Sequence, residues 1–187
     1  MNKSDVWNNE KLIEVLKNGG VAVMPTDTLY GIVGQAENKS VVERIYKIRK
    51  RAPEKPCIIL IEKLSALKKF SIALTKAEEK TIKEYNEPTS FIFDCPSEKF
   101  AYLHRGTKTL AVRLPASLEL RELLMRTGPL IAPSANPEGY PPAANIEEAK
   151  NYFGDTVDLY IDDGVIAGKA SKVIRLHNDG SESIIRG

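Results

Sequence analysis

The sequence predicts one α/β domain built on an open, twisted, mixed β-sheet. Segments with helical periodicity alternate along the chain with short apolar runs, the pattern of strands joined through helices. The continuous apolar run over 57–61 is typical of a strand buried on both faces. A length of 187 residues is enough for one domain with a proper core, and no repeat or linker divides it. We therefore expect residues 1–187 to form a single domain.

The helices are predicted from apolar spacing and from signals at their ends. Three pairs have the spacing of a capping box or N-cap: Ser40 with Glu43, Thr75 with Glu78, and Asn145 with Glu148. Glycines are expected to end two helices, at Gly19 and at Gly128. The expected helices span about 10–17, 41–50, 64–70, 76–85, 118–126 and 146–153.

The strands are predicted from the apolar runs between these helices. The first of them stops at Pro25, and Gly31 is expected to let the chain turn away after a polar stretch. The expected strands span about 21–24, 57–61, 90–93, 109–114, 130–132, 159–161, 172–176 and 183–186.

Composition and charge weigh against several classes of protein. The 27 basic and 25 acidic residues give a net charge of +2, so any anion site must come from local clustering. Cys57 and Cys95 are expected to be free thiols in a reducing cytosol. No signal peptide or membrane-length apolar run is visible, so we expect a cytoplasmic protein without membrane contact. No metal-binding motif is present, and His104 and His177 lack triad partners, so no protein-built metal site is expected.

Polar side chains follow the first strand at the point where it should end. Thr26, Asp27, Thr28 and Tyr30 come directly after Pro25. Hydroxyl groups at the end of a buried strand usually point into a crevice, although the same residue types are also ordinary in turns.

A basic segment follows the second predicted helix. Residues 46–56 carry five cations and lead directly into a buried strand, so the last of them should lie at the edge of the sheet. Solvated basic residues at a helix end are the ordinary explanation. The prolines at 53 and 56 would instead hold Arg51 and Lys55 in fixed positions, which suits a phosphate or carboxylate ligand.

Two further segments place polar groups beside apolar strands. Ser134 and Asn136 follow a short strand and could meet a base edge, a ribose or a phosphate, or simply form a turn. Thr109, Ala111 and Arg113 lie on one face of another strand. Between apolar neighbours, Arg113 needs an anionic partner, either a ligand or a structural carboxylate.

In this order the segments resemble the YrdC/TsaC family, the L-threonylcarbamoyladenylate synthases. The resemblance extends over about residues 10–187. Its motifs are Pro25-Thr26-Asp27-Thr28-Leu29-Tyr30-Gly31, Arg49-Lys50-Arg51 with Lys55-Pro56, Thr109-Leu110-Ala111-Val112-Arg113, Pro133-Ser134-Ala135-Asn136, Gly168-Lys169-Ala170-Ser171 and Arg186-Gly187.

The resemblance implies a YrdC-like fold with a positively lined concave cleft in which ATP, L-threonine and bicarbonate meet. The products would be threonylcarbamoyl-AMP and pyrophosphate, and a downstream threonylcarbamoyl-transferase complex would use the former for threonylcarbamoyladenosine (t6A) modification of tRNA. Mg²⁺ would arrive with the nucleotide phosphates. Displacement at phosphorus needs positioning and charge neutralisation more than a nucleophilic side chain, which suits a chain with cations and hydroxyls but no triad.

Carried over by motif, the expected site residues fall into three groups. Two are expected to be catalytic: Lys50 and Arg51. Four are expected to hold L-threonine: Thr28, Arg113, Ser134 and Ser171. Five are expected to hold ATP: Arg51, Lys55, Thr109, Asn136 and Arg186.

Four departures from the family pattern favour an alternative. Arg49 stands at a motif lysine, Ala52 at a usual proline and Lys172 at a usual threonine. Tyr85-Asn86-Glu87-Pro88 stands where the family has Trp-Pro-Gly-Pro. The alternative is a divergent paralogue with weak or altered adenylate-forming activity, or one that binds RNA such as tRNA or a double-stranded RNA. Binding of that second kind would weaken steeply with salt.

Overall fold

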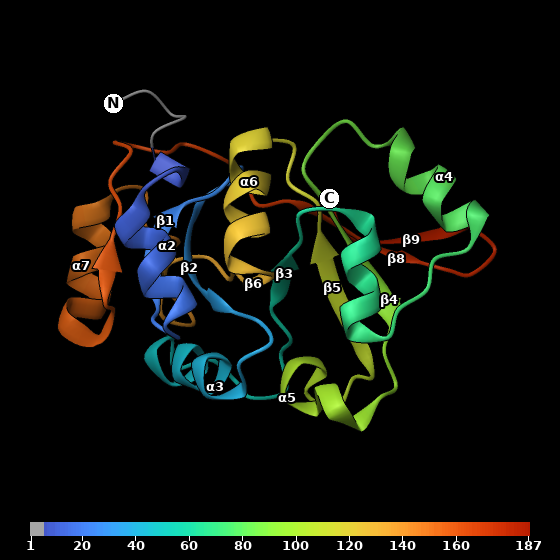
Figure 1. The fold of residues 1–187 in the computed structure, drawn as a ribbon, viewed down its shortest axis with the longest axis horizontal. Helices are drawn as coiled ribbons and strands as arrows, with labels where there is room; N and C mark the ends of the chain where they lie inside the picture. The colour runs from blue at the N-terminus through green and yellow to red at the C-terminus, as the bar shows by residue number, and fades with distance from the viewer. Residues whose placement is uncertain (1–5) are drawn as a thin grey trace.

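The strands of the computed structural model, which describes residues 6–187, form one mixed sheet (Figure 1). Nine strands lie in the order β7-β1-β2-β6-β3-β5-β4-β8-β9 in this part of the chain. They are β1 (Ala22–Pro25), β2 (Tyr30–Gln35), β3 (Ile58–Leu60), β4 (Thr89–Asp94), β5 (Thr109–Arg113), β6 (Leu130–Ile131), β7 (Leu159–Tyr160), β8 (Lys172–Leu176) and β9 (Glu182–Arg186). The pairs β1–β7, β3–β5 and β4–β8 are parallel and the other neighbours are antiparallel. The predicted α/β fold with an open mixed sheet is confirmed.

Helices pack on both faces of this sheet. They are α2 (Glu10–Lys17), α3 (Lys39–Ile48), α4 (Lys76–Glu84), α5 (Ala101–His104), α6 (Leu118–Thr127) and α7 (Ile146–Phe153), with 3₁₀ turns at Leu64–Phe70, Glu98–Phe100 and Gly154–Thr156. In β1, Ala22 and Met24 pack in a core cluster with α2 and α6, whereas Val23 packs in a second cluster with α3 and α7. The alternation of side chains along a strand therefore separates the two halves of the core.

The start of α3 differs from the prediction. The helix begins at Lys39, and its N-cap is Asn38 rather than Ser40. The Asn38 side chain accepts hydrogen bonds from the backbone N–H groups of both Ser40 and Val41. An asparagine two residues upstream thus caps the first turn, and the helix begins two residues earlier than predicted.

Strand β2 was not predicted, and Gly31 does not turn the chain. Gly31 lies within β2 and pairs with Met24, while the turn occupies the residues between Pro25 and Tyr30. A Cβ at Gly31 would lie 3.0 Å from the Thr26 Cγ2 atom and 3.5 Å from the Pro133 carbonyl oxygen. The glycine therefore allows close packing in a strand rather than a change of direction.

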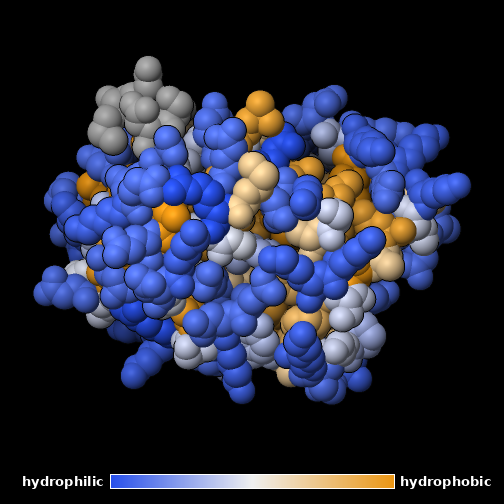
Figure 2. Space-filling model, in the orientation of Figure 1, coloured by the Kyte–Doolittle hydropathy of each residue, from blue (hydrophilic) through white to orange (hydrophobic). Residues whose placement is uncertain are grey.

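The other two predicted helix caps are confirmed. Thr75 and Glu78 form a reciprocal capping box at the start of α4, and Asn145 caps α7. Cys57 and Cys95 are free and buried. In the described residues no helix has the length and apolarity that a membrane crossing requires. Most of the face in Figure 2 is hydrophilic, and hydrophobic side chains show mainly on the half toward α4.

Candidate active site

The ends of β1, β3, β5 and β6 meet around two adjoining cavities. The first, of about 210 Å³, is called here the hydroxyl pocket. The second, of about 380 Å³, is called the basic pocket. Both cavities are lined by Ile58, Pro133, Ser134 and Arg186, so these residues form a shared wall.

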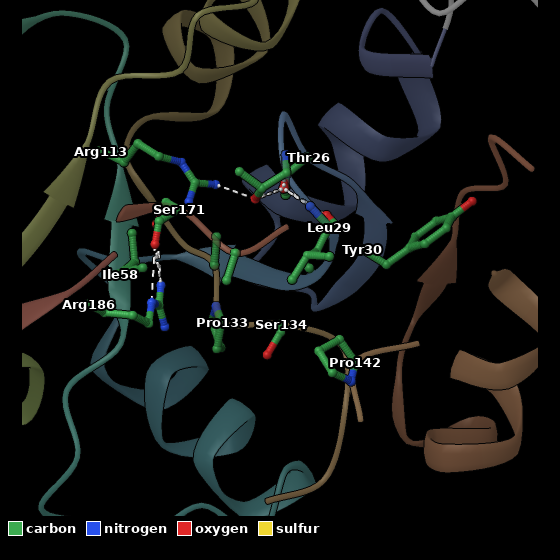
Figure 3. A pocket seen from close by; sticks show the side chains of 14 residues that line it. Thr26, Leu29, Tyr30, Ile58, Arg113, Pro133, Ser134, Pro142, Ser171 and Arg186 are labelled. Atoms are coloured by element: carbon green, nitrogen blue, oxygen red, sulfur yellow. Dashed lines mark hydrogen bonds between the residues drawn. The ribbon is translucent and has the colours of Figure 1, made fainter. Parts of the chain in front are cut away.

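The turn between β1 and β2 supplies hydroxyls to the hydroxyl pocket. The Thr26 hydroxyl donates to the Leu29 carbonyl at 2.7 Å and lies 3.1 Å from the Thr28 hydroxyl. The Thr26 backbone N–H also donates to the Leu29 carbonyl at 3.0 Å. These bonds fix the two hydroxyls, and Figure 3 shows the Tyr30 ring directed away from the cavity.

Arg113 enters the same pocket from β5 as a buried cation. Its Nη2 donates to Asp27 Oδ1 at 2.9 Å and to the Thr28 hydroxyl at 3.3 Å. Only 4% of the Arg113 side chain and 6% of the Asp27 side chain are exposed. Burial lowers the pKa of the Arg113 guanidinium, and the Asp27 carboxylate opposes that shift. Asp27 Oδ2 and Arg113 Nε have no hydrogen-bond partner, so the pair could form one further hydrogen bond through each of these atoms.

Ser171 and Arg186 line the same pocket, and Figure 3 shows Ser171 beside the Arg113 side chain. The Ser171 hydroxyl lies 2.9 Å from the Ser90 hydroxyl, and Arg186 Nη2 donates to the Ser171 carbonyl at 2.7 Å. The segment before Ser171 touches the β1–β2 turn, because a Cβ at Gly168 would lie 1.8 Å from the Thr28 carbonyl oxygen. This backbone contact lies three residues before Ser171, which lines the same pocket as Thr28.

A buried arginine beside the basic pocket joins the end of α3 to the loop that follows β6. Arg49 is 2% exposed. Its Nε donates to the Asn136 carbonyl at 2.8 Å and its Nη2 to Asn136 Oδ1 at 3.3 Å. The Ser134 hydroxyl donates to the same Asn136 oxygen at 2.6 Å. Burial lowers the pKa of Arg49, and its Nη1 atom has no partner.

The basic pocket also contains a second arginine, which is held by backbone carbonyls. Two threonines line the same pocket. Arg51 donates through Nε to the Lys55 carbonyl and through Nη2 to the Pro56 carbonyl, each at 3.0 Å. The Thr109 hydroxyl lies 3.1 Å from the Thr107 hydroxyl. Such a cavity offers cations and hydroxyls, which are groups that bind phosphate oxygens.

The residues predicted for the site are distributed unevenly over these cavities. The hydroxyl pocket collects Thr28, Arg113, Ser134, Ser171 and Arg186. The basic pocket collects Arg51, Thr109, Ser134 and Arg186. Three of the predicted residues are not among the lining residues of either pocket: Lys50, Lys55 and Asn136.

Those three residues have different surroundings. Lys50 is exposed and has a φ of 50°, just past the end of α3. Lys55 forms an ion pair with Glu138. Asn136 is 7% exposed and lies behind Ser134, where its amide donates to the Pro137 and Tyr140 carbonyls.

Two hydrogen-bonding side chains of the basic pocket have no binding role in the prediction from sequence. The motif marks Arg49 only as a departure, and no motif includes Thr107. Arg49 had one signal, its place in the last turn of a helix next to the predicted sheet edge. Thr107 had none, because its hydroxyl reaches the site only through the turn that precedes β5.

Comparison with known proteins places the chain in a family. The family model Sua5/YciO/YrdC, described as telomere recombination, matches residues 14–187. A threonylcarbamoyl-AMP synthase of Enterobacter sp. (strain 638) is 30% identical over 149 residues, or 76% of this chain and 77% of that protein. A threonylcarbamoyl-AMP synthase of Coxiella burnetii (strain RSA 493 / Nine Mile phase I) is 26% identical over 152 residues, or 80% of this chain and 82% of that protein.

Solved structures of similar proteins share the fold. P. abyssi Sua5 complexed with L-threonine superposes with a TM-score of 0.84 and 26% identity over 97% of this chain and 54% of that chain. E. coli YciO superposes with a TM-score of 0.81 and 25% identity over 98% of this chain and 89% of that chain. The chain therefore spans about half the length of the Sua5 protein that it matches.

Proposed function

The chain belongs to the Sua5/YciO/YrdC family, and on that basis we propose that it is an L-threonylcarbamoyladenylate synthase of the cytoplasm. The reaction makes it a nucleotidyltransferase that uses ATP, L-threonine and bicarbonate. The relatives named threonylcarbamoyl-AMP synthase and the similarity to a threonine-bound Sua5 support this proposal.

One observation supports the proposal: two adjoining cavities share Ser134 and Arg186, and seven of the ten predicted site residues line one or both of them. L-Threonine would lie in the hydroxyl pocket, held by Thr28, Arg113, Ser134 and Ser171. ATP would lie in the basic pocket, held by Arg51, Thr109 and Arg186, with Asn136 supporting the loop and Lys55 at its edge. A shared wall suits a reaction that joins the two ligands.

The chemistry requires the two ligands to meet at that wall. The threonine amine and bicarbonate form an N-carboxy adduct with loss of water. The adduct's carboxylate then attacks the α-phosphorus of ATP, and the bond to the β-phosphate oxygen breaks to release pyrophosphate. Arg51 would neutralise phosphate charge as it develops, and Lys50 would add to the positive field from the surface. Mg²⁺ would enter as part of the Mg·ATP substrate.

The product would pass to a separate threonylcarbamoyl-transferase complex, which modifies an adenosine of tRNA. Contact of this chain with tRNA or double-stranded RNA belongs to the same proposal and would be seen as salt-dependent binding.

Pyrophosphate release from ATP tests the proposal directly. We expect release only when L-threonine and bicarbonate are both present, with threonylcarbamoyl-AMP identified by mass spectrometry. Binding of both ligands without release would instead identify a divergent paralogue that has lost the chemistry.

A further inference from the structure

The loop over 49–56 carries four of the cations near the basic pocket, and side chains outside the loop that bond to it include those of Tyr46, Asn136 and Glu138. Among the described residues, one acidic side chain outside the loop bonds to it, that of Glu138. Glu138 lies two residues after Asn136, in the loop that follows β6.

Glu138 contacts the basic loop at three points. Its carboxylate accepts a hydrogen bond from the Ala52 backbone N–H and forms an ion pair with Lys55. Its own backbone N–H donates to the Arg49 carbonyl at 2.8 Å. The carboxylate therefore closes the turn between Ala52 and Lys55, whose single backbone bond, from Lys55 N–H to the Ala52 carbonyl, is 3.2 Å long.

This turn is also what fixes Arg51. The carbonyl groups that accept from the Arg51 guanidinium belong to Lys55 and Pro56, at 3.0 Å each. A chain of bonds thus runs from Glu138 through the turn to the cation that lines the basic pocket. Without the carboxylate, the turn would keep only its one backbone bond and the bond that the Tyr46 hydroxyl donates to the Lys55 carbonyl at 2.8 Å, while the like charges of the loop would still repel one another.

We propose that Glu138 is a positioning residue for the nucleotide, which holds Arg51 in place without touching the ligand. The inference rests on the proposed function, because it takes the basic pocket to be the ATP site. The effect on ATP affinity should be opposite to the one expected from the net charge of the loop alone. Removing a carboxylate from a cationic loop would strengthen anion binding if charge alone mattered, whereas loss of the turn should weaken it.

The experiment is a titration of Mg·ATP into wild-type protein, Glu138→Gln, Glu138→Ala, Arg51→Ala and the Arg51→Ala/Glu138→Ala double variant. We expect Glu138→Ala to raise the dissociation constant for ATP about tenfold or more, because it loses bonds to a charged group. Glu138→Gln, which keeps the acceptor for Ala52 but loses the ion pair, should have a smaller effect. L-Threonine affinity should not change in either variant, and a general loss of structure would lower both affinities.

The double variant tests the route of the effect. If Glu138 acts through Arg51, the Glu138→Ala change should add nothing in the Arg51→Ala background. Glu147→Ala is the matched control, since Glu147 forms an exposed ion pair with Lys150 on α7. Tighter ATP binding in Glu138→Ala, or fully additive losses, would overturn the proposal.

One readout separates this inference from the proposed function. The Arg51 Nε–H proton should exchange slowly with solvent in the wild type and faster in Glu138→Ala, as measured by NMR without any ligand. Unchanged exchange would overturn the positioning role whether or not the protein makes threonylcarbamoyl-AMP. Failure of the wild type to bind ATP would instead count against the function.

Discussion

Arg113 and Asp27 form the most buried of the ion pairs in the described residues. A buried pair adds little net stability, because the desolvation of both charges offsets their attraction. Arg113 lines the hydroxyl pocket, and both Arg113 Nε and Asp27 Oδ2 are buried without a hydrogen-bond partner. We infer that the pair serves the proposed ligand more than it serves the fold.

Replacing both members of the pair should separate the two roles. Arg113→Met alone leaves the Asp27 carboxylate buried without a partner, and we expect it to lower the free energy of unfolding by about 3–5 kcal/mol. The Asp27→Asn/Arg113→Met double variant should recover most of that stability in denaturant unfolding. Both variants should lack the threonine-dependent pyrophosphate release expected of the wild type. Its recovery in the double variant would contradict a ligand role for Arg113.

At the scale of elements, β2 shows why the sequence did not predict every strand. The segment contains Gly31 and Gly34, and glycine ordinarily argues against a strand. A Cβ at Gly34 would lie 2.4 Å from the Val41 Cγ1 atom on α3, so helix packing requires the glycine. That requirement comes from packing between β2 and α3, and the pattern of apolar residues within β2 itself does not reveal it. By contrast, the box of Thr75 and Glu78 is local and was predicted correctly.

The contact between Gly168 and the β1–β2 turn allows a test of how the segment before β8 is placed. In Gly168→Ala, the new Cβ would overlap the Thr28 carbonyl, so the segment must move and take Ser171 with it. We expect L-threonine affinity to fall at least tenfold while ATP affinity changes little, as measured by calorimetric titration. Ala167→Ser, on an exposed neighbour, is the control. Equal loss of both affinities would show a wider disturbance.

The connection between α3 and the start of β7 should be sensitive to pH. Asp158 accepts from Arg44 Nη1 and Nη2 at 2.6 and 2.9 Å and from the Val21 N–H at 2.7 Å. The Arg44 bonds hold the pKa of Asp158 below its ordinary value of 3.8. The carboxylate therefore stabilises the fold above that value, and the contribution is lost as pH falls through the lowered folded pKa.

Asp158→Asn should accordingly lower the free energy of unfolding by about 1 kcal/mol at neutral pH, since the pair is partly exposed. The difference from the wild type should shrink below about pH 4. Denaturant unfolding between pH 3 and 7 measures it, with Asp155→Asn, an exposed aspartate on a nearby turn, as control. A difference that persists unchanged at pH 3 would mean that charge is not the cause.

At the scale of the whole molecule, the candidate site assembles residues that are far apart in sequence. Thr28, Arg113, Ser134, Ser171 and Arg186 come from separate strands and loops and meet at one cavity. Their motifs were visible in the sequence, and the resemblance grouped them by ligand. The division into two pockets, and the placement of Lys50 and Lys55 outside the lining residues, depend on loop packing that no short motif encodes.

Arg186 occupies a distinctive place in this assembly. It lies on β9, the last strand of the sheet order, yet it lines both pockets and donates to the carbonyl of Ser171, a residue of the hydroxyl pocket. A residue confined to one pocket should affect one ligand, as we expect for Arg113. A residue on the shared wall should affect both, and also the coupling between them, which must be equal in the two directions.

Arg186→Ala should therefore weaken ATP and L-threonine binding together, each by about tenfold or more, because a charged donor is lost at both sites. Titrating each ligand with and without the other measures the coupling, which should approach zero in the variant. Arg175→Ala is the matched control, since Arg175 lies on the adjacent strand β8 and pairs with Asp94 on β4. A loss confined to one ligand would place Arg186 in a single site and remove the physical basis for the shared wall.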